Sequence, residues 1–286
     1  MKKTILGIAM MLTLISCSSL NTDDNKLKIA CSFAPIYDLA YRIAGDKADI
    51  TNICGNNEPH DFSPNSSEIL AKVEKCNVLF GYGNHVDEWA SKLNSSKFYN
   101  ITTSISFEND DPHAWLSIKE SKTMLKTVYD KIVELDPSNS DTYLSNYTKA
   151  VAEFDALDAK YTSELASFQG KYLVTSHEAF HYLARDYGLN QLGLKSIANH
   201  EPTSADFQNT INTIKENNVS TIFVEELDET DSIQTVIDEL AKDGYLVTLK
   251  ELSTYEAVSE EDYASGSNYL SVMEENLNTL KESLWK

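Results

Sequence analysis

Cysteine and basic side chains are scarce in this sequence, and each shortage excludes a class of protein. Only four of the 286 residues are cysteine, and no two of them form a CxxC pair, so neither a cysteine zinc cluster nor a thioredoxin-like motif is available. Lysine and arginine number 24 against 44 acidic residues, which gives a formal net charge of −20. Because there is no basic run to hold a phosphate backbone, nucleic acid is excluded as a partner. An acidic surface concentrates cations, although it is equally typical of a soluble acidic protein.

Long hydrophobic runs are also missing, with one exception at the N-terminus. Two lysines precede an apolar run from Ile5 to Ile15, which is typical of a secretory signal and too short for a permanent membrane span. The run ends in Leu14-Ile15-Ser16-Cys17, which resembles the lipobox of bacterial lipoproteins. This resemblance implies that residues 1–16 are removed and that acylated Cys17 anchors the protein to the outer face of the cell membrane. The polar, aperiodic residues 17–26 predict a flexible tether.

Three cysteines lie beyond the lipobox, at positions 31, 54 and 76. Cys31 and Cys54 each fall in a strand-like run and could be neighbours. Because an odd number cannot pair completely, we expect three small buried thiols rather than a disulfide.

From residue 27 onward, strand-like runs alternate with helix-like runs, which predicts an α/β fold with parallel sheets flanked by helices. The strands expected in the first lobe, residues 27–135, are Leu27–Phe33, Ala48–Cys54, Val78–Tyr82 and Phe98–Ile101. Those expected in the second lobe, residues 171–286, are Lys171–Thr175, Gln191–Ser196, Thr221–Val224 and Tyr245–Leu249.

Residues 136–170 separate the two predicted lobes and have helical periodicity for much of their length. Apolar and aromatic residues recur at steps of three and four from Tyr143 until Gly170. At about 1.5 Å per residue, a helix over Ser140–Phe168 would be roughly 40 Å long, enough to run the height of a two-lobed protein. This apolar stripe extends over only four heptads and has globular sequence on both sides. It therefore favours one long bridging helix over a coiled coil.

Three histidines follow predicted strands, at the place where open α/β sheets bind ligands. His60 lies after the second strand, His113 after the fourth and His177 where the fifth strand ends. Imidazole is a natural zinc ligand, and a tetrahedral site would need one further donor, such as a carboxylate. Spacings of 53 and 64 residues exclude a zinc finger and an HExxH helix, so the three side chains would have to converge through the fold.

Recognisable motifs surround these histidines and continue to the C-terminus. They are Glu58–Phe62 with Pro64, Asp111–Leu116, His177 through Ala179-Phe180 and Tyr182 to Tyr187-Gly188-Leu189, Glu201-Pro202, and Tyr269–Leu277. Together they resemble, in order over nearly all of residues 27–286, the solute-binding lipoproteins of zinc and manganese ABC transporters. The resemblance implies two α/β lobes bridged by one rigid helix, with a single metal ion between the lobes.

The same resemblance places three metal ligands on His60, His113 and His177. Manganese-binding members have a carboxylate at the third position, whereas nitrogen donors suit zinc, so this set argues for Zn²⁺ as the transported ligand. The fourth ligand is implied to be an acid from the second lobe. Glu256 lies closest to the family position, and Glu251 is a rival.

The resemblance does not extend to every feature of the zinc-binding members. Many of them carry a long loop rich in histidine and aspartate that captures ions, but the counterpart around Phe107–Asp111 is short and has no histidine. We therefore expect such capture to be weak or absent. His85 has no assigned role, His181 is expected near the ligands or at the surface, and His200 is expected in a loop.

The leading hypothesis is a monomeric, non-enzymatic protein that binds zinc outside the cell and passes it to a membrane permease powered by a separate ATPase. The chain itself has no P-loop. Two alternatives with the same metal site are a manganese-binding homologue and an adhesin for host matrix proteins. A third alternative is a zinc hydrolase, in which water replaces Glu256 and Glu58 acts as a base.

Overall fold

The computed structural model describes residues 26–60, 62–197, 200–227 and 230–284. The predicted signal peptide, Cys17 and nearly all of the tether therefore lie outside the described residues. Within the described part of the chain, none of the helices has both the length and the hydropathy needed to cross a membrane.

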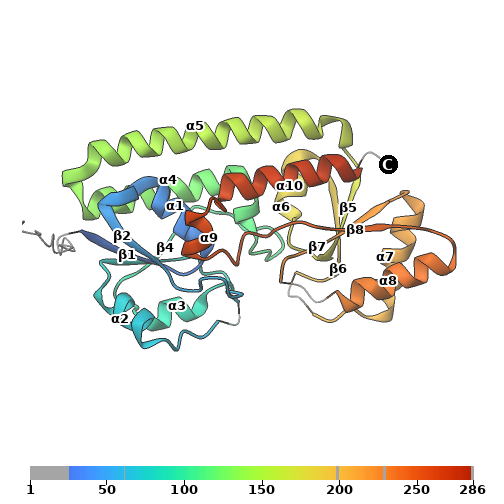
Figure 1. Ribbon diagram of the computed structural model, residues 1–286, viewed down its shortest axis with the longest axis horizontal. Helices are drawn as coiled ribbons and strands as arrows, with labels where there is room; N and C mark the ends of the chain where they lie inside the picture. The colour runs from blue at the N-terminus through green and yellow to red at the C-terminus, as the bar shows by residue number, and fades with distance from the viewer. Residues whose placement is uncertain (1–25, 61, 198–199, 228–229, 285–286) are drawn as a thin grey trace, which may run out of the picture.

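Two parallel four-stranded sheets form the framework, one in each lobe, as predicted (Figure 1). The first has the order β2-β1-β3-β4, and its strands are β1 (Leu27–Cys31), β2 (Ala48–Asn52), β3 (Val78–Gly81) and β4 (Phe98–Asn100). The second has the order β6-β5-β7-β8, and its strands are β5 (Tyr172–His177), β6 (Asn190–Lys195), β7 (Thr221–Val224) and β8 (Thr248–Glu251). In both sheets the earliest strand lies between the next two, so the strand order reverses direction beside it. This arrangement opens a crevice at the carboxyl ends of the strands, where ligands bind in such sheets.

Helices cover the sheets of both lobes (Figure 1). In the first lobe these are α1 (Ala34–Ala44), α2 (Ser67–Lys75), α3 (Glu88–Leu93) and α4 (Ile118–Leu135). After β5 come α6 (His181–Tyr187), α7 (Ser204–Glu216), α8 (Asp231–Lys242), α9 (Glu260–Ala264) and α10 (Tyr269–Leu284). Sequence patterns did not predict α9, because five residues are too few for a visible periodicity. Its start is nevertheless marked by a capping box between Ser259 and Asp262.

The long bridging helix is α5 (Ser140–Leu165), which has 26 residues and is flanked by short 3₁₀ turns at Pro137–Asn139 and Ala166–Phe168. It runs along both lobes beside α4 and α10 (Figure 1). Its buried residues are Tyr143, Ala150, Phe154, Leu157, Tyr161 and Leu165, which form the stripe predicted from the sequence. The prediction of two α/β lobes bridged by one long helix is thus confirmed.

One hydrophobic cluster continues through α5 from the first lobe into the second. It includes Ile29 of β1, Phe154 of α5, Phe223 of β7 and Leu277 of α10, all of them buried. A smaller cluster around Val174 and Ile222 lies within the second lobe. Because the larger core spans both lobes, relative motion of the lobes has to preserve most of this packing.

The three remaining cysteines are free and buried, as expected from the sequence. Burial raises the pKa of each thiol. These cysteines behave as small apolar side chains of the first lobe.

Candidate metal centre

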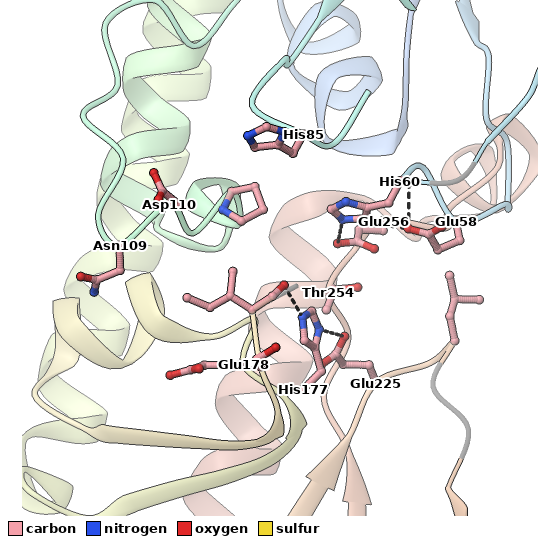
Figure 2. Close-up of a pocket in the computed structure, with 14 residues that line it drawn as sticks. Glu58, His60, His85, Asn109, Asp110, His177, Glu178, Glu225, Thr254 and Glu256 are labelled. Atoms are coloured by element: carbon pink, nitrogen blue, oxygen red, sulfur yellow. Dashed lines mark hydrogen bonds and ion pairs between the residues drawn. The ribbon is translucent and has the colours of Figure 1, made fainter. Parts of the chain in front are cut away.

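A cavity of about 660 Å³ opens between the lobes at the carboxyl ends of both sheets. Side chains from both lobes point into it (Figure 2). Those with potential metal-ligand atoms are Glu58, His60, His85, Asp110, His177, Glu178, Glu225 and Glu256. His113 lies just behind this lining and is only 1% exposed.

His113 is held in one orientation by the aspartate two residues before it. Asp111 Oδ1 accepts hydrogen bonds from the backbone amide of His113 at 2.9 Å and from its Nδ1 at 2.6 Å. Because a carboxylate only accepts, Nδ1 carries a proton, and in the neutral imidazole Nε2 therefore holds the lone pair. Nε2 is buried and has no hydrogen-bond partner among the described residues. A buried imidazole oriented by a carboxylate, with its other nitrogen unpaired, is typical of a metal ligand.

His60 and Glu256 face each other beside His113. The distance from His60 Nε2 to Glu256 Oε1 is 3.9 Å, and the two imidazole rings of His60 and His113 lie 5.9 Å apart between centroids. One ligand atom from each of these three residues lies within 4.8 Å of the other two. Ligand atoms around a tetrahedral zinc are about 3.4 Å apart, given bonds of about 2.1 Å, so the three need only a small approach to share one ion.

Neighbouring acids raise the affinity of His60 for protons. Burial alone would lower its pKa, but the nearby carboxylate of Glu256, together with the charge of Glu58, raises it above its usual value. The backbone amide of His60 donates to Glu58 Oε1 at 2.8 Å, so Glu58 holds the loop that carries His60. The same negative field that favours imidazolium would also favour a divalent cation.

His177 lies next to this cluster but has different partners. Its ring centroid is 5.0 Å from that of His113, whereas Nδ1 is 3.2 Å from Glu225 Oε2 and Nε2 is 3.0 Å from the carbonyl oxygen of Ile197 (Figure 2). Burial would lower the pKa of His177, but the hydrogen bond and charge of Glu225 outweigh it and raise the pKa to about 9. The structure therefore groups His60, His113 and Glu256, and places His177 beside them with both nitrogens engaged.

The two candidates for the acidic ligand occupy different places. Glu256 is 7% exposed and lies in the cavity with His60. Glu251 is exposed at the end of β8 and lines a separate surface hollow together with Lys250 and Glu226. Geometry thus favours Glu256 over Glu251.

The other histidines lie toward the surface. The side chain of His85 is 78% exposed and lies 3.1 Å from Glu88 at the mouth of the cavity. His181 Nε2 is 3.2 Å from Glu108 Oε2, and both side chains are partly exposed. His200 is exposed.

Two residues of the site, Asp111 and Glu225, were not predicted. Asp111 is the first residue of the Asp111–Leu116 motif, but no role was assigned to it. Its position two residues before His113 is the signal that would have indicated a role in orienting that histidine. Glu225 directly follows β7, so the rule that located the three histidines at strand ends would have found it too.

Comparisons with known proteins identify the family to which this chain is related. Residues 29–283 match the family described as zinc-uptake complex component A, periplasmic. The zinc-binding lipoprotein AdcA of Streptococcus pneumoniae serotype 4 is 29% identical over 312 residues, which cover 99% of this chain but 61% of AdcA. The high-affinity zinc uptake system protein ZnuA of Bacillus subtilis is 27% identical, with 93% of this chain and 90% of ZnuA covered.

Solved structures show the same architecture. The zinc-bound ZnuA-like domain of S. pneumoniae AdcA has a TM-score of 0.75 and 29% sequence identity, covering 91% of this chain and all of that domain. This chain thus corresponds in length to that one domain of AdcA, about three fifths of the full-length relative.

Proposed function

The chain belongs to the periplasmic zinc-uptake complex component A family, and on that premise we propose that it is the extracytoplasmic zinc-binding component of an ABC import system. Two observations on one residue carry the proposal: Nε2 of His113 is buried without a hydrogen-bond partner among the described residues, and His113 forms a cluster of potential metal ligands with His60 and Glu256. Zinc is the cargo in this proposal and is released to a membrane permease.

Four side chains would hold the ion: His60, His113, His177 and Glu256. To bind the ion, His177 Nε2 would leave the carbonyl oxygen of Ile197 and coordinate the metal. Its Nδ1 would stay bonded to Glu225, in the same way that Nδ1 of His113 is bonded to Asp111. A set of three nitrogens and one carboxylate oxygen fits zinc better than manganese. Because the protein fills all four positions, no position stays open for a reactive water, so we propose a binding protein rather than an enzyme.

The protein would act outside the cell membrane, held there by a lipid anchor. Residues 1–16 would be the signal peptide, acylated Cys17 would anchor the chain to the outer face of the membrane, and residues 17–26 would form the tether. The lobes would be residues 27–135 and 171–286, joined by residues 136–170. The protein would act as a monomer that docks on its permease.

Native mass spectrometry of the chain from Cys17 onward, offered equal concentrations of zinc and manganese, tests the proposed function. We expect one zinc ion per chain and no retained manganese, because imidazole ligands prefer zinc. Preferential retention of manganese would contradict the zinc assignment, and retention of neither ion would contradict the function.

Glu256→Ala is expected to weaken zinc binding, whereas Glu251→Ala should leave the affinity unchanged. The reason is that Glu256 lies 3.9 Å from His60 in the cavity and Glu251 lies in another hollow. Chelator competition at constant pH measures both affinities. A larger loss in Glu251→Ala would reverse the assignment of the fourth ligand.

A further inference from the structure

The segment that carries Glu256 follows the last strand of the second lobe but is attached to the first lobe. It leaves the second lobe at Ser253 and Thr254, where Glu226 accepts bonds from the Ser253 hydroxyl and the Thr254 amide, both at 2.9 Å. Beyond that point the segment makes its contacts with the first lobe. Trp115, two residues after His113, donates its indole N–H to the carbonyl of Thr254 at 2.8 Å.

Contacts with the first lobe continue beyond Glu256. The amide side chain of Asn52, at the end of β2, donates to the carbonyl of Val258 at 2.8 Å, and its backbone amide donates to Glu260 at 2.8 Å. In α9, Tyr263 packs its ring against Tyr37 and Tyr41 of α1 at centroid distances of 5.3 and 5.0 Å. Figure 1 shows α9 beside α1, within the first lobe.

Tyr255 has an unusual backbone conformation next to the proposed ligand. Its φ is 62°, in the left-handed region that a bulky residue rarely adopts and that surrounding contacts have to maintain. Its amide donates to the Ser253 hydroxyl at 3.0 Å, and its own hydroxyl reaches Asp38 Oδ2 of α1 at 3.3 Å. The tyrosine is fully buried, so the adjacent Glu256 is turned toward His60 by a fixed backbone.

Asp38 is itself rigidly held. It is fully buried, forms an ion pair with Arg42 one turn later, and accepts the backbone amide of Tyr269 at 3.0 Å. Arg42 also contacts Glu153 of α5 at 3.1 Å and Asn268 at 3.0 Å. The hydroxyl of Tyr255 is therefore bonded to a carboxylate that is fixed to α1, to α5 and to the start of α10.

We propose that Tyr255, through its hydrogen bond to Asp38, is a positioning residue for zinc, and that it makes Glu256 a ligand of the first lobe. Three ligands, His60, His113 and Glu256, then form one preassembled half-site. His177, held by Glu225 and the carbonyl of Ile197, is the ligand that the second lobe supplies and withdraws. The proposal rests on the proposed zinc-binding function.

Tyr255→Phe tests this inference, because it removes the hydroxyl and keeps the ring. We expect zinc affinity to fall about 10-fold or more, as for the loss of other groups that orient a ligand. In a Glu256→Ala background, the same substitution should cause no further loss, since there is no longer a ligand for Tyr255 to position. Chelator competition on the chain from Cys17 onward gives the four affinities of this double-mutant cycle.

Tyr161→Phe is the matched control. Tyr161 is also fully buried, and its hydroxyl donates to the carbonyl of Met273 in the core between α5 and α10. This variant loses a comparable hydrogen bond without touching the site, so it should change the thermal midpoint of the metal-free protein but not its zinc affinity.

An unchanged affinity in Tyr255→Phe would overturn the positioning role, and so would an equal loss in both backgrounds, which would indicate a general structural effect. These results are distinct from failure of the proposed function, in which the unmodified protein would not retain zinc.

Discussion

His113→Ala is expected to weaken zinc binding by about 10²–10³-fold, the largest loss of affinity for any single substitution at the site. Zinc sites with four protein ligands have binding free energies of about 10–16 kcal/mol, so one ligand accounts for about 2.5–4 kcal/mol. His113 is the best preorganised of the proposed ligands, because it is buried, fixed by Asp111 and has an unpaired Nε2. Chelator competition at constant pH measures the loss.

His181→Ala provides the control, since this histidine pairs with Glu108 at the surface and should leave the affinity unchanged. The substitution at His113 also leaves Asp111 buried without its imidazole partner, so the stability of the metal-free variant has to be measured separately. An affinity within threefold of the unmodified protein, in a variant shown to be folded, would remove His113 from the ligand set.

The fold could be predicted from the sequence because buried parallel strands are apolar runs and the helices between them are amphipathic. The predicted ends of the strands agree less well with the observed ends. Leu27–Phe33 was predicted as a strand, but β1 ends at Cys31 because Phe33 is already the N-cap residue of α1. The last strand, predicted at Tyr245–Leu249, begins only at Thr248, since Tyr245 lies in the connection and donates its hydroxyl to the carbonyl of Val219.

The site could be predicted only as a set of positions at strand ends. Strand order indicates that His60, His113 and His177 lie near one crevice, but it does not give the direction of each ring. That His177 turns toward Glu225 and the carbonyl of Ile197 depends on segments brought together by the fold. The attachment of Glu256 to the first lobe depends likewise on a bond from its neighbour Tyr255 to Asp38, 217 residues earlier in the chain.

Phe154→Ala is expected to lower the free energy of unfolding by about 3–5 kcal/mol, the largest loss of stability among the changes considered. Phe154 lies in the middle of α5 and is fully buried. Its ring stacks on Tyr269 of α10 at 5.2 Å with an interplanar angle of 9°, and the guanidinium of Arg42 lies 5.6 Å from its centroid. Removing the ring would leave a cavity where α1, α5 and α10 meet. Urea denaturation of the metal-free protein measures the change.

Leu144→Ala on the same helix is the matched control, because this leucine is 51% exposed and its truncation should cost less than about 0.5 kcal/mol. The shape of the transition carries further information. Since the core cluster around Phe154 includes buried residues of both sheets, Ile29 and Phe223 among them, both lobes should lose structure in one cooperative transition. A loss below about 1 kcal/mol in Phe154→Ala, or two separate transitions in the unmodified protein, would mean that α5 joins two independent cores. The helix would then not limit the motion by which the second lobe supplies or withdraws His177.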